Sequence, residues 1–134
     1  MKKHISLLVV AAVLFLSSCA DEDAAEPFAD DREKFLGDWT CQEQPNTTTP
    51  FTISIDPLGS GDSVYISNFS GYGSTAVAVA IVDGKNLTIP AQQISQTNIP
   101  VQGSGVYSST GGDEKINMNY TAYGQSVSAV CTKQ

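Results

Sequence analysis

The stretch AVAVAIVDGKNLTIP, residues 76–90, decides the fold class of this chain. Small and apolar residues alternate over residues 76–82, and a period of two is that of a β-strand. Asp83-Gly84 then predicts a tight hairpin turn, after which residues 86–90 return as a second strand. We expect Val77, Val79 and Ile81 to face the core. This stretch therefore predicts an antiparallel β-sheet.

The same pattern extends outward in both directions. Short alternating runs, separated by turns rich in Gly, Asn, Asp and Ser, give about eight or nine strands in hairpin order. The one expected helix is short, covers residues 27–37 and stops at Gly37. We predict an antiparallel up-and-down β-barrel of about eight strands with a short N-terminal helix, and a β-sandwich as the alternative. The further strands are expected at residues 39–44, 51–55, 63–69, 101–108, 115–123 and 126–133, with a possible one at 92–95.

The N-terminus has the pattern of a secretory signal. Lys2 and Lys3 precede an apolar run over residues 5–16, which at about 1.5 Å per residue is too short to span a bilayer of about 30 Å. Leu16-Ser17-Ser18-Cys19 resembles the lipobox of bacterial lipoproteins. This resemblance implies cleavage before Cys19, acylation of its thiol and a stable membrane anchor. The alternative is an ordinary cleavage site followed by a free thiol.

These features divide the chain into a signal peptide (1–18), a lipidated acidic tether (19–33) and a β-barrel domain (34–134). Asp21, Glu22 and Asp23 resemble the export signal of Bacteroidetes lipoproteins, which implies lipid anchoring to the outer membrane at the cell surface or on the periplasmic face. The alternative is a solvated tether repelled by anionic lipid. The acidic net charge of −7 offers no basic face, so we expect no nucleic-acid partner.

With Cys19 acylated, Cys41 and Cys131 are the two thiols that remain. The exported compartment is oxidising, so we expect them to form a structural disulfide. The pair would join the first strand to the last, which is what closure of a barrel requires. On the chain-entropy model a loop of this length stabilises the fold by about 4–5 kcal/mol.

A second resemblance begins at Gly37-Asp38-Trp39, after the expected short helix. This segment resembles the Gly-x-Trp start of the lipocalin and fatty-acid-binding superfamily. The resemblance implies that Trp39 plugs one end of an up-and-down barrel, with a basic partner on the last strand for which Lys133 is the nearest candidate. The body of the chain is also similar to small Bacteroidetes lipoproteins described as lipocalin-like. The alternative for Trp39 is a core aromatic of another β fold.

Catalytic chemistry has little support in the sequence. His4 is the only histidine and leaves with the signal, and Asp56, Asp62, Asp83 and Asp113 all fall at expected turns. We therefore expect no enzyme, cofactor or metal site. Asp62-Ser63-Val64 matches the Bacteroidetes pattern for O-glycosylation, which makes Ser63 a candidate for modification.

Two classes of function remain. The first is a carrier of a small apolar ligand, and the second is a non-catalytic accessory module that contacts a protein or a glycan. A cavity of several hundred Å³ would favour the carrier, and a filled interior the module. The residues expected near a cavity are Trp39, Phe51, Ile53, Val79 and Met118, and the aromatics expected beside the turns are Tyr65, Phe69, Tyr72 and Tyr107.

Overall fold

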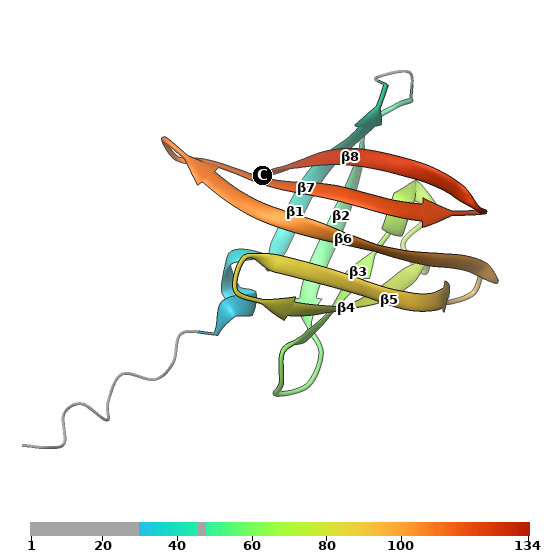
Figure 1. Cartoon of the computed structure of the whole chain (residues 1–134), viewed down its shortest axis with the longest axis horizontal. Helices are drawn as coiled ribbons and strands as arrows, with labels where there is room; N and C mark the ends of the chain where they lie inside the picture. Colours follow the sequence, from blue (N-terminus) through green and yellow to red (C-terminus); the bar gives the residue numbers. More distant parts are fainter. Residues whose placement is uncertain (1–29, 46–47) are drawn as a thin grey trace, which may run out of the picture.

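The chain folds into a closed barrel of eight antiparallel strands, each hydrogen-bonded to the next in sequence (Figure 1). The computed structural model describes residues 30–45 and 48–134. The strands are β1 (Gly37–Gln44), β2 (Phe51–Pro57), β3 (Ser63–Ser67), β4 (Val77–Asp83), β5 (Asn86–Ile94), β6 (Ile99–Thr110), β7 (Asp113–Ala122) and β8 (Gln125–Lys133). Two 3-10 turns, η1 (Asp31–Lys34) and η2 (Phe69–Gly71), complete the described elements.

The predicted up-and-down barrel is confirmed, and the sandwich is excluded because β8 pairs with β1. Two details differ from the sequence prediction. In place of the expected helix, the described part of this segment forms a 3-10 turn, η1. The side chain of Asp30 caps this turn. The two short strands expected at 86–90 and 92–95 are one strand, β5, with a register shift between Ile89 and Gln92. Pro90, which has no N–H to donate, lies within this irregular part.

The interior is filled by side chains from every strand and from both turns. Trp39, Phe35 and Phe69 are the largest fully buried side chains. The predicted inward face of β7 is confirmed, because Ile116, Met118 and Tyr120 are buried.

The predicted inward face of β4 is wrong. Ala78, Ala80 and Val82 face the core, whereas Val79 is half-buried and Ile81 is exposed on the outer face. Paired residues of an antiparallel sheet share a face, and the inward Val64 pairs with Ala80. Both faces of AVAVAIV are apolar, so hydrophobicity did not decide between them.

The alternating direction of the strands gives the barrel two ends. The η1 end carries η1 and the connections at residues 58–62, 84–85 and 111–112. The η2 end carries residues 48–50, η2 and the turns at 95–98 and 123–124. The predicted signal peptide, Cys19 and nearly all of the predicted tether lie outside the described residues.

Candidate functional site

A void bordered by core side chains lies under η2. It measures about 10 Å³, which is room for a single water at most. Phe51, Ile53 and Met118, three of the residues expected near a ligand cavity, border this void. Trp39 is buried but does not border the void, and Val79 lies on the outside, so its predicted place in the interior is wrong.

The η1 end is closed by aromatic rings that pack edge to face. The Trp39 indole Nε1 donates to the Phe35 carbonyl at 2.7 Å, and both rings make edge contacts with Tyr107. Lys133 pairs with Trp39 across β8 and β1, and its Nζ lies 4.6 Å from the centroid of the indole ring. The same Nζ donates to the Leu36 carbonyl at 2.6 Å. Lys133, the nearest candidate for a basic partner of Trp39, therefore contacts the indole ring.

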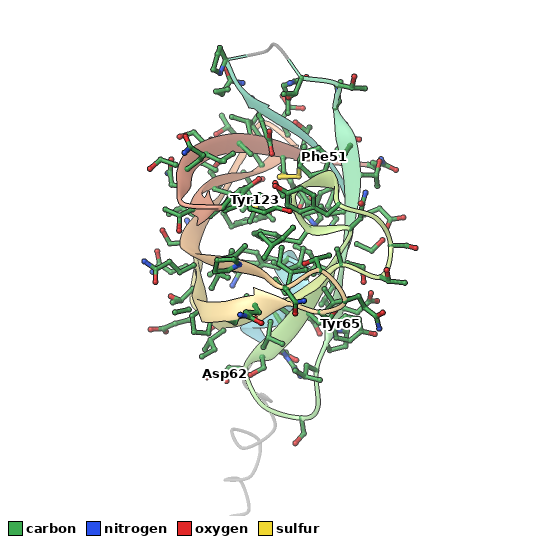
Figure 2. All side chains as sticks on the ribbon, turned by 90° about the vertical axis from the view of Figure 1, so that its right-hand side faces the viewer. Phe51, Asp62, Tyr65 and Tyr123 are labelled. Carbon is green, nitrogen blue, oxygen red and sulfur yellow. A yellow bond between two sulfur atoms is a disulfide. The ribbon has the colours of Figure 1, made fainter. Side chains whose placement is uncertain are left out.

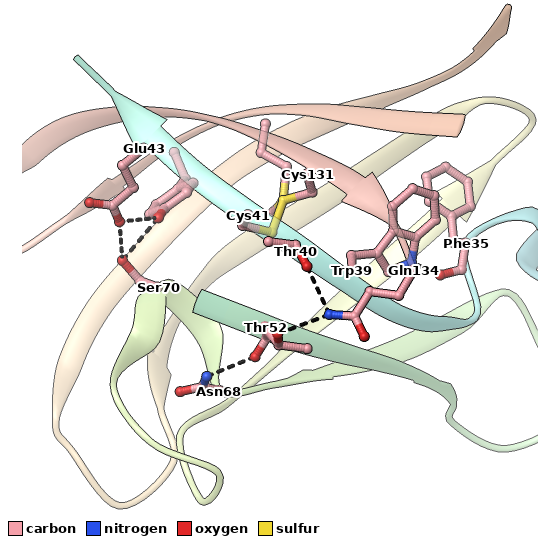
Figure 3. The surroundings of a disulfide bond; sticks show 12 residues. Phe35, Trp39, Thr40, Cys41, Glu43, Thr52, Asn68, Ser70, Cys131 and Gln134 are labelled. Carbon is pink, nitrogen blue, oxygen red and sulfur yellow. Dashed lines mark hydrogen bonds between the residues drawn. A yellow bond between two sulfur atoms is a disulfide. The ribbon is translucent and has the colours of Figure 1, made fainter. Parts of the chain in front are cut away.

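The η2 end is closed by a clamp. Phe69 of η2 is buried against the ring of Tyr120, with centroids 4.8 Å apart. The hydroxyls of Tyr120 and Ser70 both donate to Oε1 of Glu43, at 2.9 and 3.0 Å (Figure 3). Burial, aided by the Glu43 carboxylate, holds the pKa of Tyr120 well above its ordinary value, so the phenol stays a donor. These contacts fix η2 over the end of the barrel.

The predicted disulfide between Cys41 and Cys131 is present, and it lies between these two closed ends (Figure 3). The two residues are register partners on β1 and β8, and both are buried. The disulfide therefore links the first and last strands at the seam of the barrel.

A hollow lies on the outer face of β5 to β8. It is an open groove of about 650 Å³, and its exposed side chains point away from the core. Its hydrogen-bonding groups are neutral amides and hydroxyls, and the hydroxyl of Ser128 donates to the side-chain oxygen of Asn119 at 2.6 Å. The exposed residues of this outer groove are Pro90, Ala91, Gln102, Asn119, Ser126 and Ser128, with Thr121 half-buried beside them.

Two exposed tyrosines stand at the η2 end. Tyr72, 39% exposed, follows η2, and Tyr123, 64% exposed, forms the turn between β7 and β8. Their rings are perpendicular, with centroids 6.0 Å apart. Of the other aromatics expected beside turns, Phe69 and Tyr107 pack over the barrel ends and Tyr65 lies half-buried on the outside of β3.

Charge divides the molecule along the barrel. Apart from Glu43, every Asp, Glu, Lys and Arg of the described residues lies on η1 or near the η1 end. Arg32 and Lys34 of η1 donate there to the backbone carbonyls of Ser63 and Gly84. Asp62 marks this end at the bottom of Figure 2, away from Phe51 and Tyr123. Among the described residues, the η2 end therefore carries one charged side chain, Glu43, and no Lys or Arg.

The sequence prediction missed the outer groove and Tyr123. Residues 115–123 were assigned to one strand, so Tyr123 was not recognised as a turn residue. The signal was the dipeptide Tyr123-Gly124, because a Gly in this position marks a two-residue hairpin turn. No local sequence pattern predicts the groove, because residues from four strands, β5 to β8, line it together.

The chain shows no significant match to a protein-family model, a curated protein or a solved structure. Residues 30–45 and 48–134 contain no group of three or more His, Cys, Asp or Glu side chains that could hold a metal ion. Nor does this part of the chain contain a helix long and apolar enough to cross a membrane. Ser63 is half-buried at the start of β3, and its modification stays a prediction.

Proposed function

We propose that this chain is a lipid-anchored, non-catalytic accessory module that binds its partner on the outside of a filled barrel. The observation that carries the proposal is the contrast between an interior void of about 10 Å³ and an outer groove of about 650 Å³. Sites for small molecules usually measure about 300–1,000 Å³ and enclose most of the ligand. The interior void is far smaller than this, and the groove is large enough but open to solvent. A closed, filled barrel offers its partner the outer surface instead.

The polarity of the barrel supports this arrangement. The described chain begins at Asp30 beside η1, so an anchor at Cys19 would hold the charged η1 end toward the membrane. The η2 end, with Tyr72 and Tyr123, would then face away from it. Replacing Cys19 by Ser in the full chain tests the anchor. We expect the wild-type chain in the membrane fraction and the Cys19→Ser chain in the soluble fraction, and equal fractionation would refute lipid anchoring.

Photo-crosslinking in cells tests the binding surface. A benzophenone side chain replaces Asn119 in the outer groove or, as a control, Lys115 on the same outer face of β7 near the η1 end. We expect a reproducible high-mass adduct from position 119 and none from position 115. Equal labelling at both positions, or none at either, would argue against a partner in the groove.

A carrier of a small apolar molecule is the second candidate. It is favoured by the barrel fold, which is compatible with ligand binding, and by the apolar groups of Phe51, Ile53 and Met118 around the void under η2. Native mass spectrometry of the full chain, released from detergent micelles, separates the two functions. A bare lipidated mass supports the accessory module. An additional small mass that is lost on denaturation would support the carrier.

A further inference from the structure

We propose that Tyr72 and Tyr123, together with the outer groove of β5 to β8, form a binding site for a neutral carbohydrate chain. This inference rests on the proposed function and specifies the chemical class of the partner. It is carried by the backbone at Tyr123, the fixed position of Tyr72 and the absence of basic side chains at the η2 end among the described residues.

The backbone at Tyr123 is the first observation. Tyr123 and Gly124 have φ values of 54° and 72°, so both residues of this turn are left-handed. Asn, Asp or Gly normally occupies the first position of such a turn, and a bulky side chain there is an outlier. The ring gains little from burial, because the residue is 64% exposed. A strained, exposed aromatic residue is better explained by an external contact than by folding.

The second observation is that Tyr72 is held in place before any partner binds. Asn68 donates to the Thr52 carbonyl at 2.7 Å, and its side-chain oxygen accepts from the Gly73 amide at 2.7 Å. Ser70 is tied to Glu43, and Phe69 is buried beneath. Because the loop is already ordered on both sides of Tyr72, binding would lose little conformational entropy. Tyr123 then completes the pair at a ring distance of 6.0 Å.

The third observation is the chemistry around the rings. The apolar C–H faces of a sugar ring can stack on an exposed aromatic side chain, while its hydroxyls require amide and hydroxyl partners. The outer groove supplies such partners through Gln102, Asn119 and Ser128. Thr121 and Ser126 are register partners in the groove, and the Tyr123 turn lies two residues further along, or about 7 Å. One chain of sugars can therefore contact both features.

Charge excludes the competing partners. Nucleic acids and acidic polysaccharides require Lys or Arg, and no Lys or Arg lies at the η2 end among the described residues. The outer groove is lined by uncharged residues throughout. A neutral carbohydrate is the class of partner that combines ring faces with many hydroxyls and needs no counter-charge.

The test uses the full lipidated chain in nanodiscs, probed in a binding assay with soluble neutral polysaccharides: an α-glucan, a β-glucan, a mannan, a galactomannan and a xylan. Polygalacturonate is the anionic control. The main variant is Tyr123→Asn, because Asn adopts the left-handed turn and lacks the ring. Tyr123→Gly is a second variant that meets the same two conditions. Tyr65→Thr removes a ring from the outside of β3 and is the matched control. Trp39 fluorescence during urea unfolding verifies that each variant is folded.

We expect at least one neutral polysaccharide to bind and polygalacturonate not to bind. Affinity should fall about tenfold or more in Tyr123→Asn, consistent with the loss of one stacked ring, and should be unchanged in Tyr65→Thr. Absence of binding to all five neutral polysaccharides would overturn the inference, and so would binding that Tyr123→Asn leaves unchanged. If the crosslinker at position 119 captures a protein while no polysaccharide binds, the accessory module stands and the carbohydrate site falls. If neither experiment shows a partner, both fall.

Discussion

Gly103 of β6 is the register partner of Tyr120 on β7. A Cβ at this position would overlap the backbone of Asn119 and Tyr120, and backbone atoms have no other rotamer to adopt. At Gly105 the nearest atoms are side-chain carbons of Ile116 and Met118, at 3.1 and 3.3 Å. Small side-chain movements can relieve the crowding at Gly105, whereas the overlap at Gly103 requires the two strands to separate.

We therefore expect Gly103→Ala to lower the free energy of unfolding by about 3 kcal/mol and Gly105→Ala by about 1 kcal/mol. Urea unfolding monitored through Trp39, the only tryptophan and fully buried, measures both. The two variants add the same methyl group to the same strand, so each controls for the other. Equal losses would show that the strands at Gly103 move apart easily.

Single residues also show where reasoning from sequence succeeds. The resemblance carried by Gly37-Asp38-Trp39 led us to expect Trp39 at a barrel end and to name Lys133 as its candidate partner, and in the structure the two side chains are in contact. Val79 was assigned to the wrong face because both faces of β4 are apolar. The choice between them is made by the inward Val64 and Ile66 of β3, and by an interior already filled with large aromatic rings. Such competition for space is not encoded in the local pattern.

Among the elements, β5 departs from β4 beyond their shared turn, and the side chain of Gln92 bridges the gap. Its oxygen accepts from the Val79 amide at 2.8 Å, and its nitrogen donates to the Val79 carbonyl at 2.7 Å. Gln92 thus takes the place of backbone pairing between β4 and β5, which ends at Ile81↔Thr88. The sequence showed an interruption here but not the side-chain bridge that crosses it.

Replacing Gln92 by Leu should cost about 1–3 kcal/mol, because both hydrogen bonds to the half-buried Val79 are lost, together with one to the Pro90 carbonyl. Hydrogen exchange should locate the effect at the Val79 amide, whose protection should fall in the variant. Gln93→Leu, which changes the exposed neighbouring residue, is the matched control. Unchanged protection at Val79 would show that water replaces the bridge without loss.

The η1 turn is stabilised by an ion pair between Asp30 and Arg32, which acid should weaken. Asp30 accepts from the Arg32 amide at 3.0 Å and from the Arg32 guanidinium at 2.7 Å. These hydrogen bonds hold the pKa of Asp30 below its ordinary value of 3.8. A carboxyl whose pKa is lower in the folded chain stabilises it above the ordinary value, and the contribution is lost as the pH falls through the folded pKa.

We expect the unfolding midpoint in urea to fall as the pH is lowered below about 4, and to fall less steeply in Asp30→Asn. At pH 7 the variant should be less stable than the wild type, because the capping carboxylate and its pairing with Arg32 are gone. Identical pH slopes for the two proteins would show that Asp30 contributes no titratable stability.

For the whole molecule, composition and hairpin order were enough to predict a barrel. Each predicted strand had a turn signal beside it, and a meander of about eight strands leaves few architectures without exposed edges. The candidate site was not predictable in the same way. Its groove is formed by residues of four strands, β5 to β8, and its lack of Lys and Arg among the described residues depends on which turns share an end of the barrel. Both are properties of the closed fold.

The disulfide closes this fold at its seam, between residues 90 apart in sequence. The backbone pairing of β1 with β8 already extends from Trp39↔Lys133 to Gln44↔Ser128, so the folded barrel has little further need of the bond. Its main effect should be on the unfolded chain, whose entropy it reduces. A Cys41→Ala, Cys131→Ala double variant should therefore keep the native near-ultraviolet circular dichroism and lose about 4 kcal/mol of unfolding free energy. The wild-type chain unfolded under reducing conditions controls for the two lost sulfur atoms, since it removes the cross-link and keeps both side chains. A loss of less than about 1 kcal/mol in both cases would contradict the entropic account.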